Sequence, residues 1–356
     1  MRSVTPDSTP MLGDYDGSRR NNFTALRIFF AWCVLFGHSF PITGHGELNP
    51  LREFFEKSTW IGEIAVSGFF AISGFLVTAS FARRGLLDYC ISRVLRIYPA
   101  LIVCVCLTTV VLGAWLTTLE RADYFTNPRT WNYLWNTTAL FPMSFRLPGV
   151  FESLPRPGVN GSLWTLPVEV SCYILLMVVG ATGLLRWRTL GNLAALALLL
   201  FAFNYFGDIP LVGRIEKWAE PCVYFLLGVV CYLNRAAIPL SLPLGVAAAA
   251  LAYVALGKPW FDFVFPPAFV YLIFFLAYRS PFLDIDRWFG DPSYGIYIYA
   301  WPVQQVIVYL FPQQGPYFNT ALATLVVVTL ALLSWHFLEK PALGLKRRWL
   351  KTSPEG

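Results

Sequence analysis

The sequence predicts an all-α polytopic membrane protein, a bundle of about ten transmembrane helices with the N- and C-termini in the cytoplasm. Hydrophobic residues make up 56% of the 356-residue chain and charged residues only 13%, and the mean hydropathy is +0.54. A soluble domain carries about 25% charged residues, so this chain lacks the polar surface to face water on all sides. The apolar residues also fall into blocks of about 20, the length that crosses the hydrocarbon core of a bilayer.

Hydrophobic runs define the expected helices in chain order. They cover residues 23–41, 62–82, 96–117, 163–184, 189–206, 219–233, 238–256, 262–278, 293–311 and 319–338. The first 20 residues contain no apolar stretch that ends in a small-residue cleavage site, so the first helix is expected to remain as an anchor. The connector over about 118–162 is rich in Trp, Pro and Asn. Its length and composition predict a folded cap or a re-entrant segment.

The distribution of basic residues predicts the orientation. With the N-terminus inside, 17 of the 27 Lys and Arg residues lie on the inner side, nine lie on the outer side, and Arg27 lies in the first turns of the first helix. This asymmetry follows the positive-inside rule and accounts for the net charge of +6, so nucleic acid is not an expected partner. We expect a cytoplasmic tail over 1–20, a transmembrane domain over 21–343 and a basic cytoplasmic tail over 344–356.

The seven cysteines and three histidines form no metal-binding pattern. No CxxC pair is present, and too few histidines accompany the cysteines for a zinc site. We therefore expect packing thiols and no metal.

Three ionisable residues lie where lipid is expected. Arg27 and His38 are 11 residues apart on the first helix, which places them on one stripe about 16 Å apart along the axis. Glu169 precedes a purely apolar run. Charged groups inside spans are costly and are functional candidates by default. The alternatives are a snorkelling arginine, an interfacial histidine and a carboxylate at a helix start.

Two further segments carry polar or small residues at helical spacing. Ser73 and Gly74 lie in the second helix, where small residues allow close helix packing. Arg93 and Arg96 are three residues apart and therefore neighbours on one helical face, a spacing that suits phosphate binding. An ordinary positive-inside loop explains the same arginines without any ligand.

Taken in order, these motifs resemble the acyltransferase-3 family of integral membrane acyltransferases. The resemblance covers about residues 21–343. Its motifs are Arg27-x10-His38, Phe69-Phe70-x-x-Ser73-Gly74-Phe75, Arg93-x-x-Arg96-x-x-Pro99, Asn160-x-Ser162-Leu163-Trp164-Thr165-Leu166-x-x-Glu169, Gly290-x-x-Ser293-Tyr294-Gly295-Ile296-Tyr297 and Ser334-x-x-x-x-Glu339-x-Pro341.

The resemblance implies a membrane O-acyltransferase. Members of the family move an acyl group, commonly acetyl, from cytoplasmic acyl-CoA to an acceptor that is typically a sugar hydroxyl on the far side of the membrane. The co-substrate is then acetyl-CoA or another acyl-CoA, and the acceptor a lipopolysaccharide, an exopolysaccharide or a lipid-linked saccharide. Membrane lipid is a further partner, a bacterial inner membrane is the expected location, and the oligomeric state stays open.

The same resemblance assigns roles to the candidate residues. His38 acts as general base or as a transient acyl carrier, and Glu169 orients its imidazole. Arg27, Arg93 and Arg96 bind the phosphates of the acyl donor. Candidates for oxyanion or sugar hydrogen bonds are Ser73, Asn160 and Tyr294.

The chain departs from the family in two places. Many members carry a histidine after the Trp of a Tyr-Leu-Trp-His-x-Pro run, whereas Trp301 is followed directly by Pro302 here. His38 is therefore the main catalytic candidate. No hydrolase-like domain follows the bundle, so transfer is expected to be completed by the bundle or by a separate partner. The alternative function is a transporter or flippase of a lipid-linked glycan, which would also show ten spans with buried charges but is expected to show repeated halves.

Overall fold

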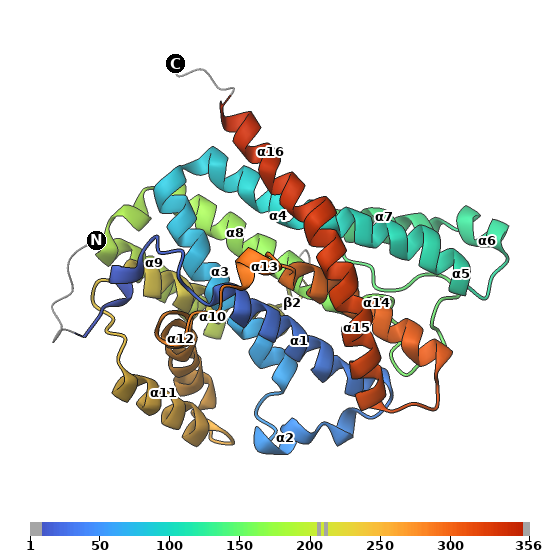
Figure 1. Cartoon of the computed structure of the whole chain (residues 1–356), viewed down its shortest axis with the longest axis horizontal. Helices are drawn as coiled ribbons and strands as arrows, with labels where there is room; N and C mark the ends of the chain where they lie inside the picture. Colours follow the sequence, from blue (N-terminus) through green and yellow to red (C-terminus); the bar gives the residue numbers. More distant parts are fainter. Residues whose placement is uncertain (1–8, 205–207, 210–212, 352–356) are drawn as a thin grey trace. The chain divides into compact units, whose positions relative to one another are not determined.

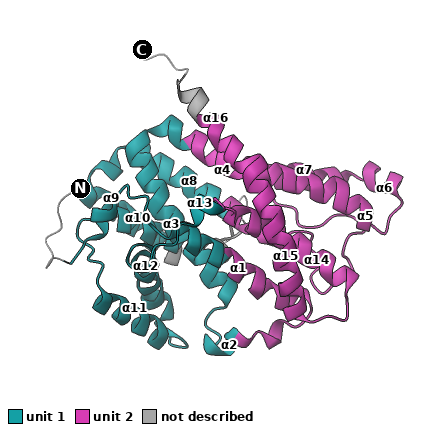
Figure 2. Cartoon of the chain, in the orientation of Figure 1, with its two compact units in different colours: residues 1–30, 51–89, 168–288 teal, residues 31–50, 90–167, 289–356 magenta. Residues whose placement is uncertain are grey.

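A computed structural model describes residues 9–204, 208, 209 and 213–351, and within them the chain is almost entirely helical (Figure 1). Each of the ten predicted spans overlaps a helix. The last two residues of the fifth span lie outside the described residues, and so do residues 1–8 of the predicted N-terminal tail and 352–356 of the predicted C-terminal tail. The chain divides into two compact units (Figure 2). Unit 1 comprises Met1–Phe30, Leu51–Tyr89 and Val168–Trp288, and unit 2 comprises Ala31–Pro50, Cys90–Pro167 and Phe289–Gly356.

Four helices contribute residues to both units, namely α1 (Phe23–Ile42), α2 (Pro50–Phe54), α4 (Leu86–Cys106) and α8 (Thr165–Ala181). Unit 1 further contains η1 (Leu12–Tyr15), α3 (Ile61–Arg84), η5 (Leu184–Arg186), α9 (Arg188–Asn204), α10 (Ile215–Leu233), α11 (Leu242–Ala255), α12 (Phe261–Arg279) and α13 (Ile285–Trp288). Its strands β1 (Asp208–Ile209) and β2 (Gly213–Arg214) form a two-residue antiparallel pair in a stretch expected to be an outer loop.

Close contact between α3 and α10 organises unit 1. A Cβ atom on Gly74 would lie 2.0 Å from the carbonyl oxygen of Phe225, and a Cβ atom on Gly228 would lie 2.3 Å from that of Ala71. Glycine is therefore required at both places, because any side chain would collide with the backbone of the facing helix. Gly74 of the second predicted span thus serves helix packing, whereas the role of Ser73 stays a prediction.

The described N-terminal segment is part of the fold of unit 1. Leu12 is fully buried, and its backbone N–H donates to the carbonyl oxygen of Ile238 at 2.8 Å. Asp16 forms ion pairs with Arg83 at 3.5 Å and with Arg235 at 3.0 Å. These contacts tie residues before α1 to the ends of α3 and α10.

Unit 2 contains the C-terminal helices of the chain and the long connector. Its remaining elements are η2 (Gly46–Leu48), the π-helix η3 (Leu107–Gly113), α5 (Ala114–Leu116), α6 (Arg121–Thr126), α7 (Pro128–Ala139), η4 (Gly161–Trp164), α14 (Ser293–Leu310), α15 (Pro316–Ser334), the π-helix η6 (Trp335–Glu339) and α16 (Lys340–Lys351). The long connector predicted as a cap or re-entrant segment therefore carries helices of its own. One of its tyrosines, Tyr124, donates from its hydroxyl to the carbonyl oxygen of Thr109 in η3 at 2.7 Å.

Local sequence signals explain where several helices begin and end. The side chain of Asn127 accepts a hydrogen bond from the backbone N–H of Arg129, with Pro128 in the first turn of α7. Gly85, at a φ of 79°, ends α3 and is the only residue between α3 and α4. The basic connector expected between the second and third spans is therefore helical, and it forms the start of α4.

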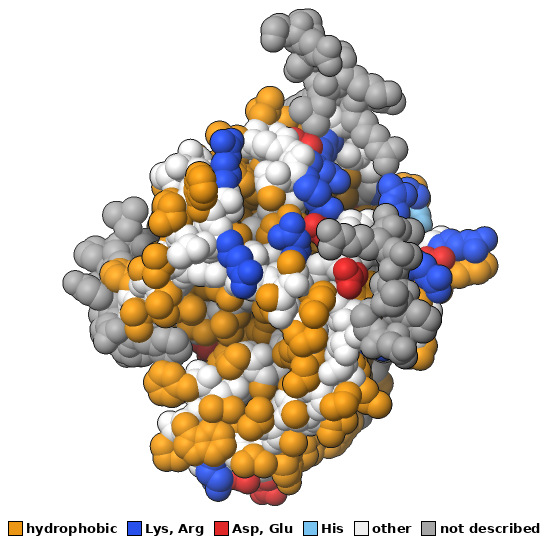
Figure 3. All heavy atoms as spheres, turned by 90° about the vertical axis from the view of Figure 1, so that its left-hand side faces the viewer, with side chains coloured by type: hydrophobic (Ala, Val, Ile, Leu, Met, Phe, Trp, Pro, Cys, Tyr) orange, Lys and Arg blue, Asp and Glu red, His pale blue; other side chains and the backbone are white. Residues whose placement is uncertain are grey.

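Among the described residues, six helices are long and apolar enough to cross a membrane. They are Phe23–Ile42, Ile61–Arg84, Leu86–Leu116, Gly161–Ala181, Phe261–Arg279 and Pro316–Lys346. Shorter apolar helices cover Arg188–Phe201, Ala219–Leu233 and Leu242–Ala255. On the face drawn in Figure 3, hydrophobic side chains cover most of the lower part, and most Lys and Arg side chains lie above them. The chain is thus a multi-pass membrane protein, while the count of ten spans and the orientation stay predictions.

Candidate active site

His38 lies in the part of α1 that belongs to unit 2, between a hydroxyl and an indole. Its Nδ1 atom is 3.5 Å from Oγ of Ser162 in η4, at the outer limit of a hydrogen bond. Its ring meets Trp301 of α14 edge to face, with ring centroids 4.9 Å apart and an interplanar angle of 73°. His38 and Trp301 are each partly exposed, whereas Ser162 is buried. The imidazole is therefore held in place at one nitrogen and at one face.

One face of α14 holds the segment 158–162, which contains Ser162, the hydroxyl partner of His38. Tyr297, Trp301 and Gln305 follow at four-residue spacing and therefore lie on one side of the helix. Trp301 Nε1 and Gln305 Nε2 donate to the same carbonyl oxygen, that of Gly158, at 2.8 and 2.6 Å. The hydroxyl of Tyr297 donates to the carbonyl oxygen of Ser162 at 2.7 Å. These bonds make α14 the support of the candidate site.

Two buried amides complete this polar cluster. Asn160 Nδ2 donates to the carbonyl oxygen of Ile298 at 2.8 Å. Gln304 Nε2 donates to Oγ of Ser39 at 2.7 Å, the residue that follows His38 on α1. Hydrogen-bonded polar residues therefore surround the candidate histidine, although the helices that carry them are mostly apolar.

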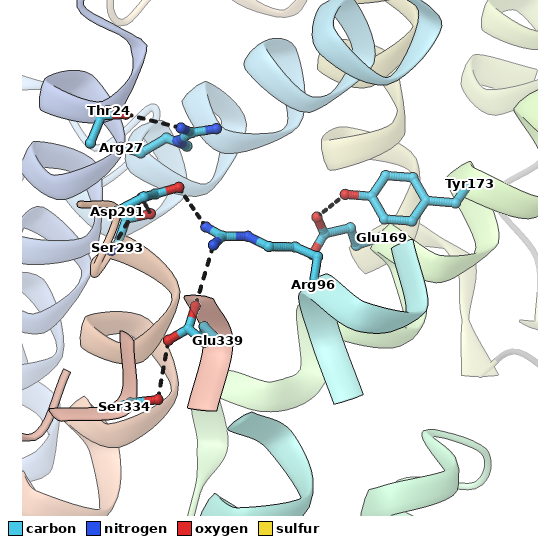
Figure 4. Close-up of polar contacts among 9 residues, drawn as sticks. All are labelled: Thr24, Arg27, Arg96, Glu169, Tyr173, Asp291, Ser293, Ser334 and Glu339. Carbon is cyan, nitrogen blue, oxygen red and sulfur yellow. Dashed lines mark hydrogen bonds and ion pairs between the residues drawn. The ribbon is translucent and has the colours of Figure 1, made fainter. Parts of the chain in front are cut away.

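Arg96 lies at the centre of a second polar cluster in unit 2 (Figure 4). Its guanidinium forms an ion pair with Asp291 at 2.7 Å and another with Glu339 at 3.3 Å. Each carboxylate has a hydroxyl partner, because Ser293 Oγ donates to Asp291 at 2.6 Å and Ser334 Oγ donates to Glu339 at 3.1 Å. The cluster joins α4 to the segment before α14 and to η6.

Aromatic rings border the same guanidinium. It lies 5.8 Å from the ring centroid of Tyr294 and 5.9 Å from that of Trp335. The hydroxyl of Tyr294 donates to the carbonyl oxygen of Ile97 at 3.0 Å. A phosphate at Arg96 would have to compete with two carboxylates, so phosphate binding by Arg93 and Arg96 stays a prediction.

The other predicted site residues lie in unit 1. Arg27 Nη2 donates to Oγ1 of Thr24 at 3.2 Å, and Glu169 accepts a hydrogen bond from the hydroxyl of Tyr173 (Figure 4). Ser73 is half-buried on α3. Glu169 belongs to unit 1 and His38 to unit 2, and the hypothesis that the Glu169 carboxylate orients the catalytic imidazole stays a prediction.

Each unit also contains a cavity whose lining, as described, includes none of the predicted site residues. The cavity of unit 1 has a volume of about 1040 Å³ and is lined by the N-terminal segment together with Arg235 and Tyr278. The cavity of unit 2 has a volume of about 710 Å³ and is almost entirely apolar, with Cys104, Tyr299 and Ser334 among its few polar residues. Among the described residues, no three His, Cys, Asp or Glu side chains form a group that could hold a metal ion.

Sequence reasoning missed the partners that hold these groups. Asp291 follows the glycine of the motif that begins at Gly290, but no rule based on spacing pairs it with an arginine 195 residues earlier. Gln304 and Gln305 are neutral, so a search for ionisable groups within spans passed over them. Two adjacent amides in an apolar helix were the signal that could have found them.

Comparison with known proteins confirms the family that the motifs predict. The acyltransferase-3 family profile, described as "Acyltransferase domain", matches residues 20–337. The chain is 29% identical over 346 residues to an O-acetyl transferase of Shigella phage Sf6, covering 90% of this chain and 96% of that protein. It is 27% identical over 370 residues to nodulation protein 10 of Rhizobium leguminosarum bv. viciae, covering 94% of this chain and 96% of that protein. No solved structure matches this chain.

Proposed function

This chain belongs to the acyltransferase-3 family, and from that membership we propose that it transfers an acetyl group from cytoplasmic acetyl-CoA to a sugar hydroxyl on the outer side of the membrane. The acceptor is an envelope or secreted glycan, free or lipid-linked, and the location is a bacterial inner membrane. The similarity to a phage protein named for O-acetyl transfer supports acetyl as the acyl group.

The observation that carries the proposal is the placement of His38. An alcohol attacks a thioester efficiently when a base near neutral pKa removes its proton, and imidazole is the side chain best suited to that task. Nδ1 lies 3.5 Å from Oγ of Ser162, and the proposal takes the tautomer in which Nδ1–H donates to this hydroxyl, so that Nε2 carries the lone pair that accepts the proton.

The reaction balances with this one base. Nε2 of His38 takes the hydroxyl proton while the sugar oxygen forms a bond to the thioester carbonyl carbon. The carbon–sulfur bond then breaks, the proton returns from the imidazolium to the departing thiolate, and the products are the sugar ester and CoA. In the alternative course, Nε2 attacks the thioester carbonyl carbon and CoA leaves as the thiolate. The sugar oxygen then takes the acetyl group as the bond to Nε2 breaks, and the hydroxyl proton passes to the freed Nε2 and on to the thiolate. Glu169 is proposed to stabilise the imidazolium in either course.

The donor side of the site is proposed to use the basic residues of the cytoplasmic half. Arg27 and Arg93 supply positive charge for the phosphates of CoA. Arg96 can join them only if a phosphate displaces a carboxylate of Asp291 or Glu339. The rise of about 16 Å from Arg27 to His38 along α1 is comparable to an extended pantetheine arm, so the thioester can reach the outer half while the nucleotide stays inside.

The remaining candidates are proposed to contact the reacting groups. Ser73 can donate to the oxyanion. The amide nitrogen of Asn160 and the hydroxyl of Tyr294 both donate to backbone carbonyls already. The amide oxygen of Asn160 is therefore the atom of that side chain that remains for the sugar.

Acetyl transfer by purified protein tests the proposal. Full-length protein in liposomes is given radiolabelled acetyl-CoA and envelope glycan from the host that has been freed of its own esters with mild base. Wild type should release CoA and label the glycan. His38→Gln, which removes the base but keeps a polar side chain of similar size, should lower the rate by at least about 100-fold.

The matched control is His45→Gln, because His45 is exposed and lies only a few residues beyond α1. Its rate should equal that of wild type. If wild type consumes neither acetyl-CoA nor a second acyl-CoA, acyl transfer is wrong and transport of a lipid-linked glycan becomes the better hypothesis. If His38→Gln retains the wild-type rate, acyl transfer stands but His38 is not its base.

A further inference from the structure

Three side-chain amides around His38 share an unusual property. The exposed fraction is 1% for Asn160 and 0% for Gln304 and Gln305. The amide oxygen of each side chain is buried and has no hydrogen-bond donor among the residues that the structure describes. A buried carbonyl oxygen without a donor is costly, so three of them in one cluster need an explanation.

The orientation of each amide is fixed by its nitrogen. Gln305 Nε2 donates to the backbone carbonyl oxygens of Arg156 and Gly158, the latter at 2.6 Å. Gln304 Nε2 donates to the carbonyl oxygen of Leu35 at 2.9 Å, and Asn160 Nδ2 donates to a backbone carbonyl in the same way. A flipped amide would set oxygen against oxygen at all three positions. The nitrogen atoms therefore face the protein, and the oxygen atoms are the groups left over.

Each of the three amides is linked to the candidate base through a residue that contacts His38 or is adjacent to it in sequence. Gln304 bonds to Ser39, the neighbour of His38. Gln305 shares its carbonyl partner with Trp301, whose ring lies against the imidazole. Asn160 is two residues from Ser162, which faces Nδ1 of the same imidazole. The cluster reaches the surface at His38 and Trp301, which are both partly exposed.

The three side-chain oxygens without a hydrogen-bond partner in this cluster are all acceptors, so a ligand that binds them must carry hydrogen-bond donors. The phosphates and thioester of the acyl donor bring acceptors only, whereas its pantetheine arm brings two amide N–H groups and one hydroxyl. A sugar brings several hydroxyl donors, and the two Michaelis constants measured below decide between these ligands. We infer that the amide oxygens of Asn160, Gln304 and Gln305 bind hydroxyl groups of the acceptor sugar beside His38. This inference rests on the proposed function and names the residues that select its alcohol substrate.

A comparison of the KM for glycan with the KM for acetyl-CoA tests the inference. With the labelled acetyl-CoA and de-esterified host glycan described above, KM is measured for each substrate in wild type, Gln304→Met and Gln305→Met. Methionine keeps the length of the side chain and removes its acceptor. Each variant should raise the KM for glycan about tenfold, the effect of one lost hydrogen bond to a ligand, and leave the KM for acetyl-CoA within about twofold.

A second pair of variants covers the case in which the methionine proteins do not fold. Gln304→Asn and Gln305→Asn keep a neutral amide, which avoids a buried charge beside backbone carbonyl oxygens, but draw its oxygen back by one methylene. The KM for glycan should again rise about tenfold, while the KM for acetyl-CoA stays within about twofold. Gln313→Met, at an exposed position beyond the end of α14, is the matched control and should change neither constant.

The outcomes separate the two proposals. A wild type that transfers no acetyl group overturns the proposed function and this inference with it. An active wild type whose methionine variants keep the KM for glycan, or lose only kcat, overturns the inference alone, because the amides would then serve to position the loop. Asparagine variants that keep the wild-type KM for glycan, or variants that raise the KM for acetyl-CoA instead, also overturn it.

Discussion

Replacing Arg96 by methionine is expected to destabilise unit 2. Its guanidinium joins Asp291 and Glu339, whose side chains are 12% and 0% exposed, and is itself 20% exposed. Methionine keeps most of the length of the arginine stem but removes the charge. The variant therefore leaves two carboxylates close together in a site that excludes most water.

The magnitude follows from this geometry. Removing one partner of a buried ion pair costs about 3 to 5 kcal/mol, because the remaining charge stays desolvated and unpaired. The partial exposure of Arg96 and Asp291 favours the lower end of that range, so we expect a loss of about 3 kcal/mol in the free energy of unfolding. Glu339→Gln should cost less, since Arg96 keeps the shorter ion pair with Asp291.

Unfolding by added SDS in detergent micelles measures this loss through the fluorescence of the 13 tryptophans. The triple variant Arg96→Met, Asp291→Asn, Glu339→Gln is the key comparison, because it removes all three charges together. We expect it to recover most of the stability that Arg96→Met loses, since neutral amides carry neither the mutual repulsion nor the desolvation cost of two unpaired carboxylates.

The same proteins decide between a structural and a donor-binding role for Arg96. The reasoning is refuted if Arg96→Met unfolds at the same SDS fraction as wild type while its KM for acetyl-CoA rises tenfold or more. That result would place the arginine at the CoA phosphates, as the sequence motif predicts.

Three other substitutions test the packing and the support of the site. Gly74→Ala should cost about 1 to 3 kcal/mol in the free energy of unfolding, because the new methyl group meets the backbone of Phe225. Asn22→Ala should cost about 1 to 3 kcal/mol in the same assay, since it removes buried hydrogen bonds to the residues that follow α12. Tyr297→Phe should lower kcat about fivefold with both KM values unchanged, because Ser162 loses a bond worth about 1 kcal/mol to its carbonyl oxygen.

Each of these substitutions has a matched control. A Cβ atom on Gly344, in α16, would meet nothing within 4 Å, so Gly344→Ala should not lower stability and, because alanine favours a helix over glycine, should raise it by up to about 1 kcal/mol. Asn132 is exposed on α7, and Asn132→Ala should do the same. Tyr309 is 50% exposed on α14, and Tyr309→Phe should keep the wild-type kcat. Equal effects in a variant and its control would show that the contact named for that variant has no special role.

Hydropathy predicted the position of the helices well because the length of an apolar run is a local property. Hydropathy failed where a helix continues into polar sequence and where an apolar run contains a different kind of helix. The third span was expected to begin at Arg96, with Arg93 in the connector before it, but both arginines lie on α4, which begins at Leu86. The π-helix η3 could not be foreseen either, because its residues Leu107–Gly113 look like any apolar helical turn.

The candidate site was only partly predictable for a different reason. His38 was found because an ionisable group within a span is costly wherever it lies. Its partners depend on tertiary structure, and Ser162 and Trp301 come from segments far from α1 in sequence. The glutamines of α14 escaped notice because a neutral amide adds no charge to a span.

The two polar clusters of unit 2 share α14, and this shared helix gives Arg96 a reason to matter for catalysis without touching a substrate. The helix begins beside Asp291 and Ser293, which belong to the Arg96 cluster, and it supports His38 through Trp301. The rise from Ser293 to Trp301 is about 12 Å. A packed helix moves as a unit, so loosening its start shifts the ring that lies against the imidazole. Arg96→Met should therefore lower kcat together with stability, whereas loss of a phosphate contact alone would raise the KM for acetyl-CoA.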